Sequence, residues 1–379
     1  MGTRFLTYLQ SPLAGAPFDR PEPVTVELSP SEIRPGPADK LISVWDAIKG
    51  KYPNTPGAHA YEPFGGRPWG GAVHRPPVPG PDGHFDHLVP ATREFAAASV
   101  YASVRLVLAT WEKYFAETGS GSVHWHHRKQ EGVDERLEVN PWSLDNGARA
   151  GYGFIEFGTG LQGEQFNHTG PLWNNPDVIA HELGHSIVFG AIGFPGNMSA
   201  QTEWYSTDNK RQNRDYLAFH ESAGDLVSIV SCMRHDKVVD HLLERSAGNL
   251  HADNVVNTIG ELGKRSAIRH ANNKRKLAEF DSVEPDKLIP HELSLVLTGA
   301  IYSVFVDAYE EASKKEPGRQ AVQQARDWLG RALAKAWSGL SPDGMTFLKV
   351  RDALISADAS LGGAMGASLE KRFKSRGIG

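Results

Sequence analysis

Two histidines lie one helical turn apart in a segment that predicts a buried helix. His181 and His185 occupy positions i and i+4 in the run PDVIAHELGHSIVFG. Side chains four residues apart share a helix face, so both imidazoles can converge on one metal ion. Glu182 lies one position further round the helix, where its carboxylate can reach a water molecule at the metal without binding the metal itself. The spacing predicts a zinc site with Glu182 as the general base.

A zinc ion that does chemistry needs a third protein ligand and one open position for water. The run DYLAFHESAGDLVSIV offers Glu221, with Asp225 one helical turn later. We expect Glu221 to bind zinc and Asp225 to accept the outer N–H of a ligand histidine, His181 first, which would fix the orientation of that ring. His220 is the rival ligand, but the partner at i+4 belongs to Glu221.

Another group of histidines also has the composition of a metal tract. His124, His126 and His127 follow one another closely, and aromatic and β-branched neighbours predict a short strand over residues 122–128. A strand surface explains these histidines without a metal. We therefore place the metal at the other site and expect a single zinc ion.

The length, net charge and cysteine content limit the kinds of protein and partner to be expected. The chain has 379 residues, 40% of them hydrophobic, and a formal net charge of −5. That charge gives no reason to expect nucleic acid or a membrane as partner. Cys232 is the single cysteine, so no internal disulfide forms. The N-terminus has no Sec-type apolar core and no uninterrupted apolar stretch is long enough to span a bilayer, so a cytoplasmic location is the default expectation, with export by another route left open.

Local patterns divide the chain into three parts. Residues 1–90 are rich in proline and glycine and predict an N-terminal segment wrapped around a core. Residues 91–190 hold a predicted helix from Thr92 to Thr118, a strand over 152–158 and a helix from Pro176 to Phe189. Residues 191–379 begin with a loop to about 214 and are then helical. The predicted helices lie near 216–233, 236–246, 293–314, 318–337 and 345–358.

These motifs resemble the thermolysin–fungalysin group of gluzincin peptidases over roughly residues 91–379. The segments PDVIAHELGHSIV and HESAGDL resemble the group's zinc helix and third-ligand helix. The segment NGARAGYGFIEFGTG resembles its substrate strand, and ASVYASVRLVLATWEKYFAETG its long N-lobe helix. Near the end of the chain, TFLKVRDALISAD and FKSRGIG resemble the C-terminal signature of fungalysins.

The resemblance implies roles for further residues. HELSLVLTGAIYSVF aligns with the helix that carries the group's catalytic histidine, which places His291 in that role, 70 residues (291 − 221) after Glu221. The loop between His185 and Glu221 is longer than in thermolysin, so either Tyr205 or Tyr216 could stabilise the oxyanion. Asp177 matches a calcium-ligand position, but most of its partner acids are absent, and Cys232 stands where one is expected. No calcium is expected.

Substrate contacts follow from the same resemblance. Val178 and Ile268 would line the pocket for the residue after the scissile bond, which predicts cleavage before apolar residues. Arg269 would hold that residue's carbonyl, the alternative being a solvated charge at a helix end. Asn146 would contact the substrate from the turn before the substrate strand. An extended substrate would pair with the edge strand, expected around residues 153–158.

The resemblance thus implies an α+β, two-lobed gluzincin fold, with a strand-containing N-lobe, a helical C-lobe and the zinc helix at the floor of a cleft. It also implies a zinc metalloendopeptidase acting on peptides or proteins. Two alternatives stay open. One is a gluzincin aminopeptidase, for which no acidic anchor is evident near the substrate strand. The other is a non-catalytic zinc-binding interaction protein, which would have no use for Glu182 as a base.

Overall fold

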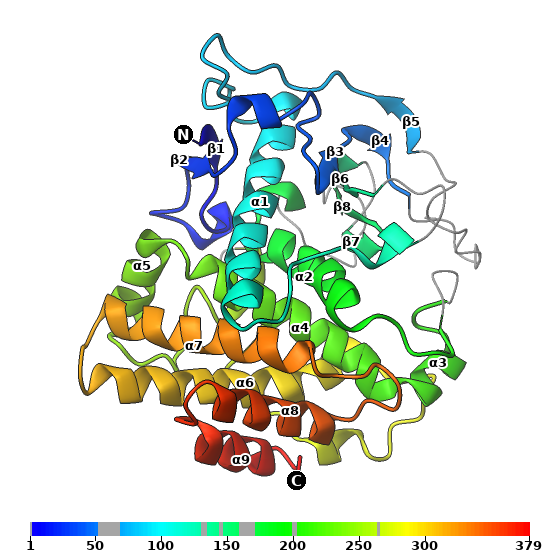
Figure 1. The fold of residues 1–379 in the computed structure, drawn as a ribbon, viewed down its shortest axis with the longest axis vertical. Helices are drawn as coiled ribbons and strands as arrows, with labels where there is room; N and C mark the ends of the chain where they lie inside the picture. The colour runs from blue at the N-terminus through cyan, green and yellow to red at the C-terminus, as the bar shows by residue number, and fades with distance from the viewer. Residues whose placement is uncertain are drawn as a thin grey trace. The chain divides into compact units, whose positions relative to one another are not determined.

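The structure of the chain is a computed structural model, drawn in Figure 1. It describes residues 2–51, 69–129, 135–143, 147–158, 171–198, 203–263 and 266–379. The chain forms two compact units. The first contains residues 1–109, 125–186 and 260–268, and the second contains residues 110–124, 187–259 and 269–379. Each unit therefore combines separate stretches of the sequence.

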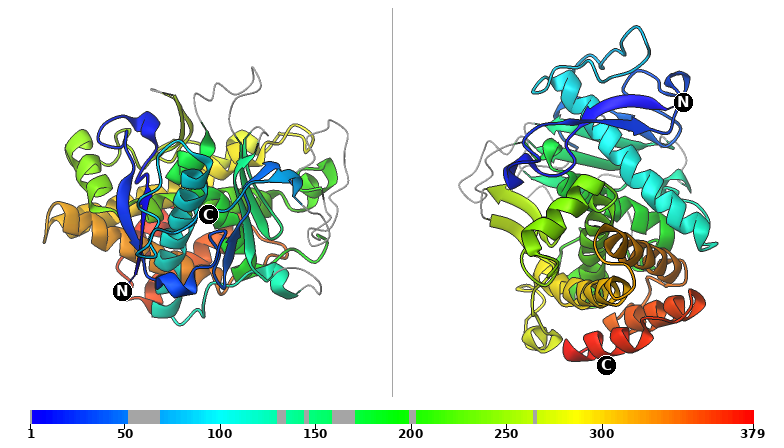
Figure 2. Two further views of the ribbon diagram at one scale, coloured as in Figure 1. Left: turned by 90° about the horizontal axis from the view of Figure 1, so that it is seen from above. Right: turned by 90° about the vertical axis from the view of Figure 1, so that its left-hand side faces the viewer.

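The N-terminal segment of the first unit is built from short strands. β1 (Thr3–Thr7) pairs antiparallel with β2 (Glu22–Val26), and β4 (Ala47–Lys49) pairs antiparallel with β5 (Gly70–Val73). The Thr7 hydroxyl lies 2.8 Å from the hydroxyls of Ser99 and Ser103, both on the first long helix. Figure 2 shows the β1–β2 hairpin alongside that helix. This contact ties β1, near the start of the chain, to the first long helix.

The main sheet of the first unit has four strands in the order β3-β6-β8-β7. β3 (Ile42–Val44) and β6 (Leu137–Ser143) are parallel, β6 and β8 (Phe154–Gly158) are parallel, and β7 (Ala148–Gly151) runs antiparallel to β8. Among the described strands, β8 therefore lies inside the sheet, and β7 forms its edge. The expectation that residues 153–158 form the edge strand is wrong, because the hairpin folds β7 onto the outer side of β8.

The segment that carries His124, His126 and His127 also differs from the strand predicted for residues 122–128. Residues 122–125 form no strand, and residues 126–129 form a short 3-10 helix, His126–Lys129. Val123 and Trp125 are buried, and the Trp125 indole N–H donates to Leu41 O at 2.7 Å. The aromatic and β-branched residues of this segment thus serve burial, and strand pairing is not the reason for their presence.

Two helices contribute residues to both units. α1 (Arg93–Glu117) has a largely buried first half, and α2 (Pro176–Ile192) carries the two histidines of the metal motif. Pro176 occupies the first turn of α2, where a missing N–H costs nothing, and Asn175 Oδ1 accepts the Asp177 N–H at 3.1 Å. Ile179, Leu183 and Val188 are buried almost completely. α2 is therefore a core helix, held on several sides.

The second unit is helical. Its described helices are α3 (Thr207–Gln212), α4 (Arg214–Cys232), α5 (Asp236–Ser246), α6 (Pro290–Ser313), α7 (Arg319–Trp337), α8 (Phe347–Ser360) and α9 (Gly366–Ser375). Figure 1 shows α6 alongside α7 and α9, with α8 next to α7. The long loop expected from 191 to 214 contains α3, and α9 is a further helix beyond those that the sequence pattern predicts. A short pair of strands, β9 (Thr258–Gly263) and β10 (Ser266–His270), precedes α6.

The loop before α6 is tied to the last helix by Arg376. Its guanidinium donates to Asn273 O, to Asn273 Oδ1 at 3.1 Å and to Arg275 O at 3.0 Å. Asn273 in turn donates to Leu295 O on α6 at 3.0 Å. This network fixes the chain that leads from β10 into α6.

α6 is long and apolar enough to cross a membrane by length and composition alone, with a mean hydropathy of 1.3 in its most apolar window. In this structure 83% of that window is buried inside the protein. Its hydrophobic residues therefore form core packing in the helical unit.

The described elements confirm the α+β class. Apart from β9 and β10, the described strands precede residue 159, and seven of the helices that follow α2 belong to the helical unit. The sequence order of a strand-containing part followed by a helical part is therefore correct.

Candidate metal centre

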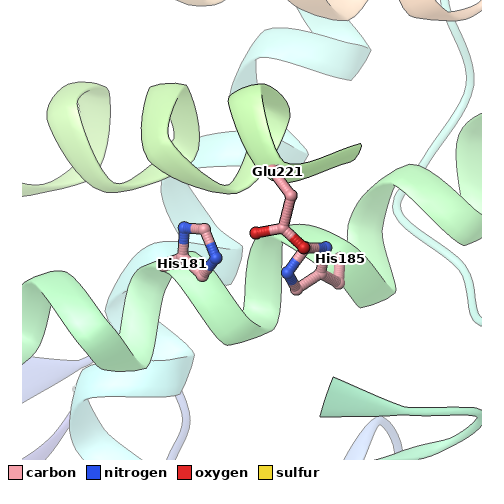
Figure 3. A group of neighbouring side chains, drawn as sticks. All are labelled: His181, His185 and Glu221. Carbon is pink, nitrogen blue, oxygen red and sulfur yellow. The ribbon is translucent and has the colours of Figure 1, made fainter. Parts of the chain in front are cut away.

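Three side chains from two helices group together in the way a metal site requires. His181 and His185 lie on α2, and Glu221 lies on α4. One ligand atom from each lies within 4.8 Å of the other two. Figure 3 shows both imidazoles directed from α2 toward the Glu221 carboxylate. Among the residues that the structure describes, this is the one group of at least three such side chains close enough to hold a metal ion.

The donor set suits zinc. Two imidazole nitrogens and one carboxylate oxygen are a ligand set of catalytic zinc sites, which keep a further position open. The two imidazole rings are perpendicular, with centroids 4.8 Å apart. His181 and Glu221 are buried, so water competes little with the ion for their donor atoms. The residues present therefore fit the metal that the sequence motif predicts.

α4 holds Glu221 rigidly. Every residue from Tyr216 to Cys232 is buried. His220, the rival ligand, is fully buried among aromatic rings, with ring centroids 4.3 Å from Phe189 and 5.4 Å from Trp204. The metal group contains Glu221 and does not contain His220. The geometry thus favours Glu221 as the third ligand.

Two further candidate residues meet at the same carboxylate. The Tyr205 hydroxyl donates to Glu221 Oε1 at 2.6 Å, and His291 Nε2 lies 3.0 Å from Glu221 Oε2. The rings of Tyr205 and His291 are 5.7 Å apart. Tyr205 is 39% exposed and the His291 side chain 42%, whereas the Glu221 side chain is 2% exposed. A molecule arriving from solvent can therefore reach the tyrosine and the histidine beside the metal ligands.

The other candidate tyrosine lies in a different environment. The Tyr216 hydroxyl donates to Gly193 O at 2.8 Å, and the residue is 1% exposed. Burial raises the pKa of its phenol well above the usual value. Tyr216 therefore has a packing role near the end of α2. Of the two candidate tyrosines, Tyr205 is therefore the one whose hydroxyl contacts Glu221.

Asp225 contacts Arg269, the arginine for which the family resemblance implies a substrate contact. Arg269 Nε donates to Asp225 Oδ1 at 2.9 Å, and both side chains are buried. Arg269 belongs to β10, so the alternative of a solvated charge at a helix end is wrong. Thr298 Oγ1, on α6, lies 3.5 Å from Asp225 Oδ2 and donates to Ser222 Oγ at 2.9 Å. This polar cluster joins α4, β10 and α6 one turn below Glu221, and sequence reasoning missed Thr298.

The remaining candidate residues are only partly described. Glu182 is buried on α2, and Val178, also on α2, is 6% exposed. Ile268 lies in β10, and its side chain is outside the described part of the structure. Asn146 lies outside the described residues altogether. The histidine group at 124–127 takes no part in the metal group; His126 Nδ1 lies 2.8 Å from the Tyr152 hydroxyl instead.

Comparison with known proteins shows a distant likeness to solved structures. No protein-family model matches the chain, and no curated protein matches it. Among solved structures, the chain is similar to the precursor of protealysin, a metalloproteinase from Serratia proteamaculans. The two are 14% identical, with a TM-score of 0.45 over 77% of this chain and 81% of that chain. A likeness this distant carries no argument about function.

Proposed function

We propose that this chain is a zinc-dependent hydrolase. The single observation that carries the proposal is the group of His181, His185 and Glu221, with Glu182 between the two histidines on α2. More particularly, we propose a metalloendopeptidase of the thermolysin–fungalysin kind, which hydrolyses internal peptide bonds. The proposal is supported by the fit of the donor set to zinc and by the presence of Tyr205 and His291 beside Glu221.

The residues would divide the work as follows. His181, His185 and Glu221 would hold the zinc ion, which when bound supplies Lewis acidity to the scissile carbonyl and lowers the pKa of water. The Glu182 carboxylate would take a proton from the attacking water and deliver it to the departing amine. Tyr205 and His291 would donate hydrogen bonds to the oxygen on which negative charge develops. Asp225, Arg269 and Thr298 would hold the surroundings of the ligands in place.

The substrate would bind as an added strand. An extended peptide pairs with the exposed edge of a sheet through main-chain hydrogen bonds. The edge of the described four-stranded sheet is β7, so residues 148–151 take the role that the sequence assigned to 153–158. Val178 and Ile268 would favour an apolar residue after the scissile bond, as proposed from the sequence.

A cleavage assay with blocked peptides tests the proposal. Quenched fluorescent peptides that carry an acetylated N-terminus should be cleaved internally, cleavage should stop with a chelator, and added zinc should restore it. The Glu182→Gln variant should retain zinc by metal analysis, while its kcat falls by about 10²–10⁴, the usual contribution of a general base.

The same assay separates the alternatives. An aminopeptidase would cleave only peptides with a free amino terminus. A non-catalytic zinc-binding protein would cleave neither kind of peptide at full zinc occupancy. Wild-type turnover by Glu182→Gln would show that another group is the base.

A further inference from the structure

The face of the sheet next to its edge strand carries four charged side chains. Arg149 on β7 stands opposite Glu156 on β8, and Glu138 on β6 lies on the same face. Lys51 completes the group: its ammonium contacts Glu138, and its backbone N–H donates to Glu156 Oε2 at 2.7 Å. We call these four residues the charged face of the sheet.

The four charges of this face balance, but they differ in exposure. The side chains of Glu156 and Lys51 are 2% and 6% exposed, and that of Glu138 is 15% exposed. Arg149 is 30% exposed and lies on the edge strand, with Nη1 3.8 Å from Glu156 Oε1. Among the described residues of β7, the charged side chain is that of Arg149, and it is partly exposed beside Glu156.

The two faces of β7 differ. Side chains alternate between the faces of a strand, so Arg149 lies on one face and Ala148 and Ala150 on the other. On the alanine side, Ala148 stands opposite Phe157, and Ala150 stands opposite Ile155, both buried and apolar. A strand added to β7 would place every second residue beside Arg149 and the intervening residues on the apolar side.

We propose that Arg149 selects an acidic side chain in the bound substrate. The inference rests on the proposed strand addition at β7. Residues directly opposite each other in paired strands have Cβ atoms about 4.5–5.5 Å apart, and opposite charges at that distance attract. The substrate class is then a peptide with Asp or Glu at the position facing Arg149 and with uncharged residues on either side of it. Arg149 is a specificity-determining residue, and it takes no part in the proton transfers.

Binding of matched peptides to the full-length Glu182→Gln protein tests this without requiring cleavage. Three fluorescent peptides differ only in having Glu, Gln or Lys at one position. A scan of that position along the peptide should find one register at which Glu binds best, by up to about fivefold over Gln. Shifting Glu by one residue should abolish the preference, because the side chain then points to the alanine side.

Charge variants of Arg149 give the decisive comparison. Arg149→Gln should bind the Glu and Gln peptides equally, and Arg149→Lys should keep the preference. Arg149→Glu should prefer the Lys peptide in the same register. Lys314→Glu, an exposed position at the end of α6, makes the same change in net charge and should leave the preference intact.

The outcomes distinguish this inference from the proposed function. Equal binding of the Glu and Gln peptides in every register, or a preference unchanged in Arg149→Gln, overturns the role of Arg149. A charge-dependent preference in a protein whose wild type cleaves no peptide would keep the role of Arg149 and overturn the peptidase assignment. Arg149→Glu would place a second carboxylate beside the buried Glu156 and could unfold the protein. In that case the comparison of Arg149→Gln with Arg149→Lys still tests whether the positive charge at position 149 sets the preference.

Discussion

Glu221 is the residue at which the candidate metal ligands and the candidate oxyanion donors meet. Its carboxylate accepts from Tyr205 at one oxygen and lies beside His291 at the other, and it belongs to the same group as His181 and His185. Side chains from distant parts of the sequence, on α2, before α3 and at the start of α6, therefore gather around the Glu221 carboxylate.

Removing the Tyr205 hydroxyl should slow the reaction without loss of zinc. Tyr205→Phe keeps the ring beside His291 but cannot donate to a developing oxyanion, and loss of one such donor typically lowers kcat by about 10²–10³. KM should change less than kcat. His291→Ala should show a fall of the same size, with zinc retained. The check is steady-state kinetics beside metal analysis.

Tyr216→Phe is the matched control, since the Tyr216 hydroxyl donates to Gly193 O and is buried. It should leave kcat within a few-fold of wild type while reducing stability. A large loss of kcat in Tyr216→Phe, with Tyr205→Phe unaffected, would reverse the assignment of the two tyrosines.

The sequence predicts residue-scale features only where they are local. The spacing of His181 and His185 is a helical period, so it can be identified without a structure. The choice between Tyr205 and Tyr216 depends on how the chain folds between the second histidine and Glu221, which are 36 positions apart (221 − 185). The residues of this loop show no helical or strand periodicity from which its fold could be predicted. The Asp225–Arg269 pair, 44 residues apart, was missed for the same reason.

At the scale of elements, α2 ends against another stretch of backbone. A Cβ placed on Gly190 would lie 1.9 Å from His124 O, a contact that no ordinary side-chain adjustment relieves. Gly190→Ala should therefore destabilise the fold by roughly 1–3 kcal/mol, despite the better helix propensity of alanine. The measurement is the midpoint of denaturant unfolding.

Gly366 in α9 provides a control within a helix. A Cβ there would meet Asp358 Oδ2 at 3.8 Å, an ordinary contact, so Gly366→Ala should be neutral or stabilising. Equal destabilisation by the two changes would show that the close approach to His124 is not what requires glycine at position 190.

Helices were easier to predict than strands in this chain. The predicted span 236–246 matches α5, and Thr92–Thr118 is within one residue of α1 at each end. Such helices have apolar residues at helical spacing over many turns. Strands are short, and β6 was not predicted because it is set by pairing with β3 and β8. The segment 122–125 has the composition of a strand, but its Trp125 is placed by burial.

For the whole molecule, a bound metal ion should act as a cross-link between α2 and α4. An ion that binds the folded state alone stabilises it by mass action, by about 4 kcal/mol at a thousandfold excess over Kd. Chelation should therefore lower the thermal midpoint of the wild type by several degrees, and zinc should restore it. Differential scanning fluorimetry measures this shift directly.

Glu221→Ala should remove most of that response. Two imidazoles without the carboxylate make a weak site, so this variant should start with a lower midpoint at saturating zinc and change little with chelator. A chelator shift as large as that of the wild type would mean that zinc stabilises the protein at another place.

The boundaries of the two compact units cannot be predicted from changes in composition along the chain. A division at residues 90 and 190 follows the change from proline-rich to mixed to helical sequence. Compactness depends on contacts between distant segments, and residues 260–268 belong with the first unit while 110–124 belong with the second. The class of fold can be predicted from sequence order, whereas membership of a unit needs the folded chain.

The edge strand of the described sheet, β7, has a further consequence for how the protein behaves in solution. An edge that can accept a substrate strand can equally accept the same edge from a second copy, which is a route to aggregation. β7 is only four residues long, and its charged arginine would face the same arginine of a second copy in an antiparallel pairing centred on that residue. Such repulsion would limit self-association at high concentration, so Arg149 would also help to keep the protein in solution.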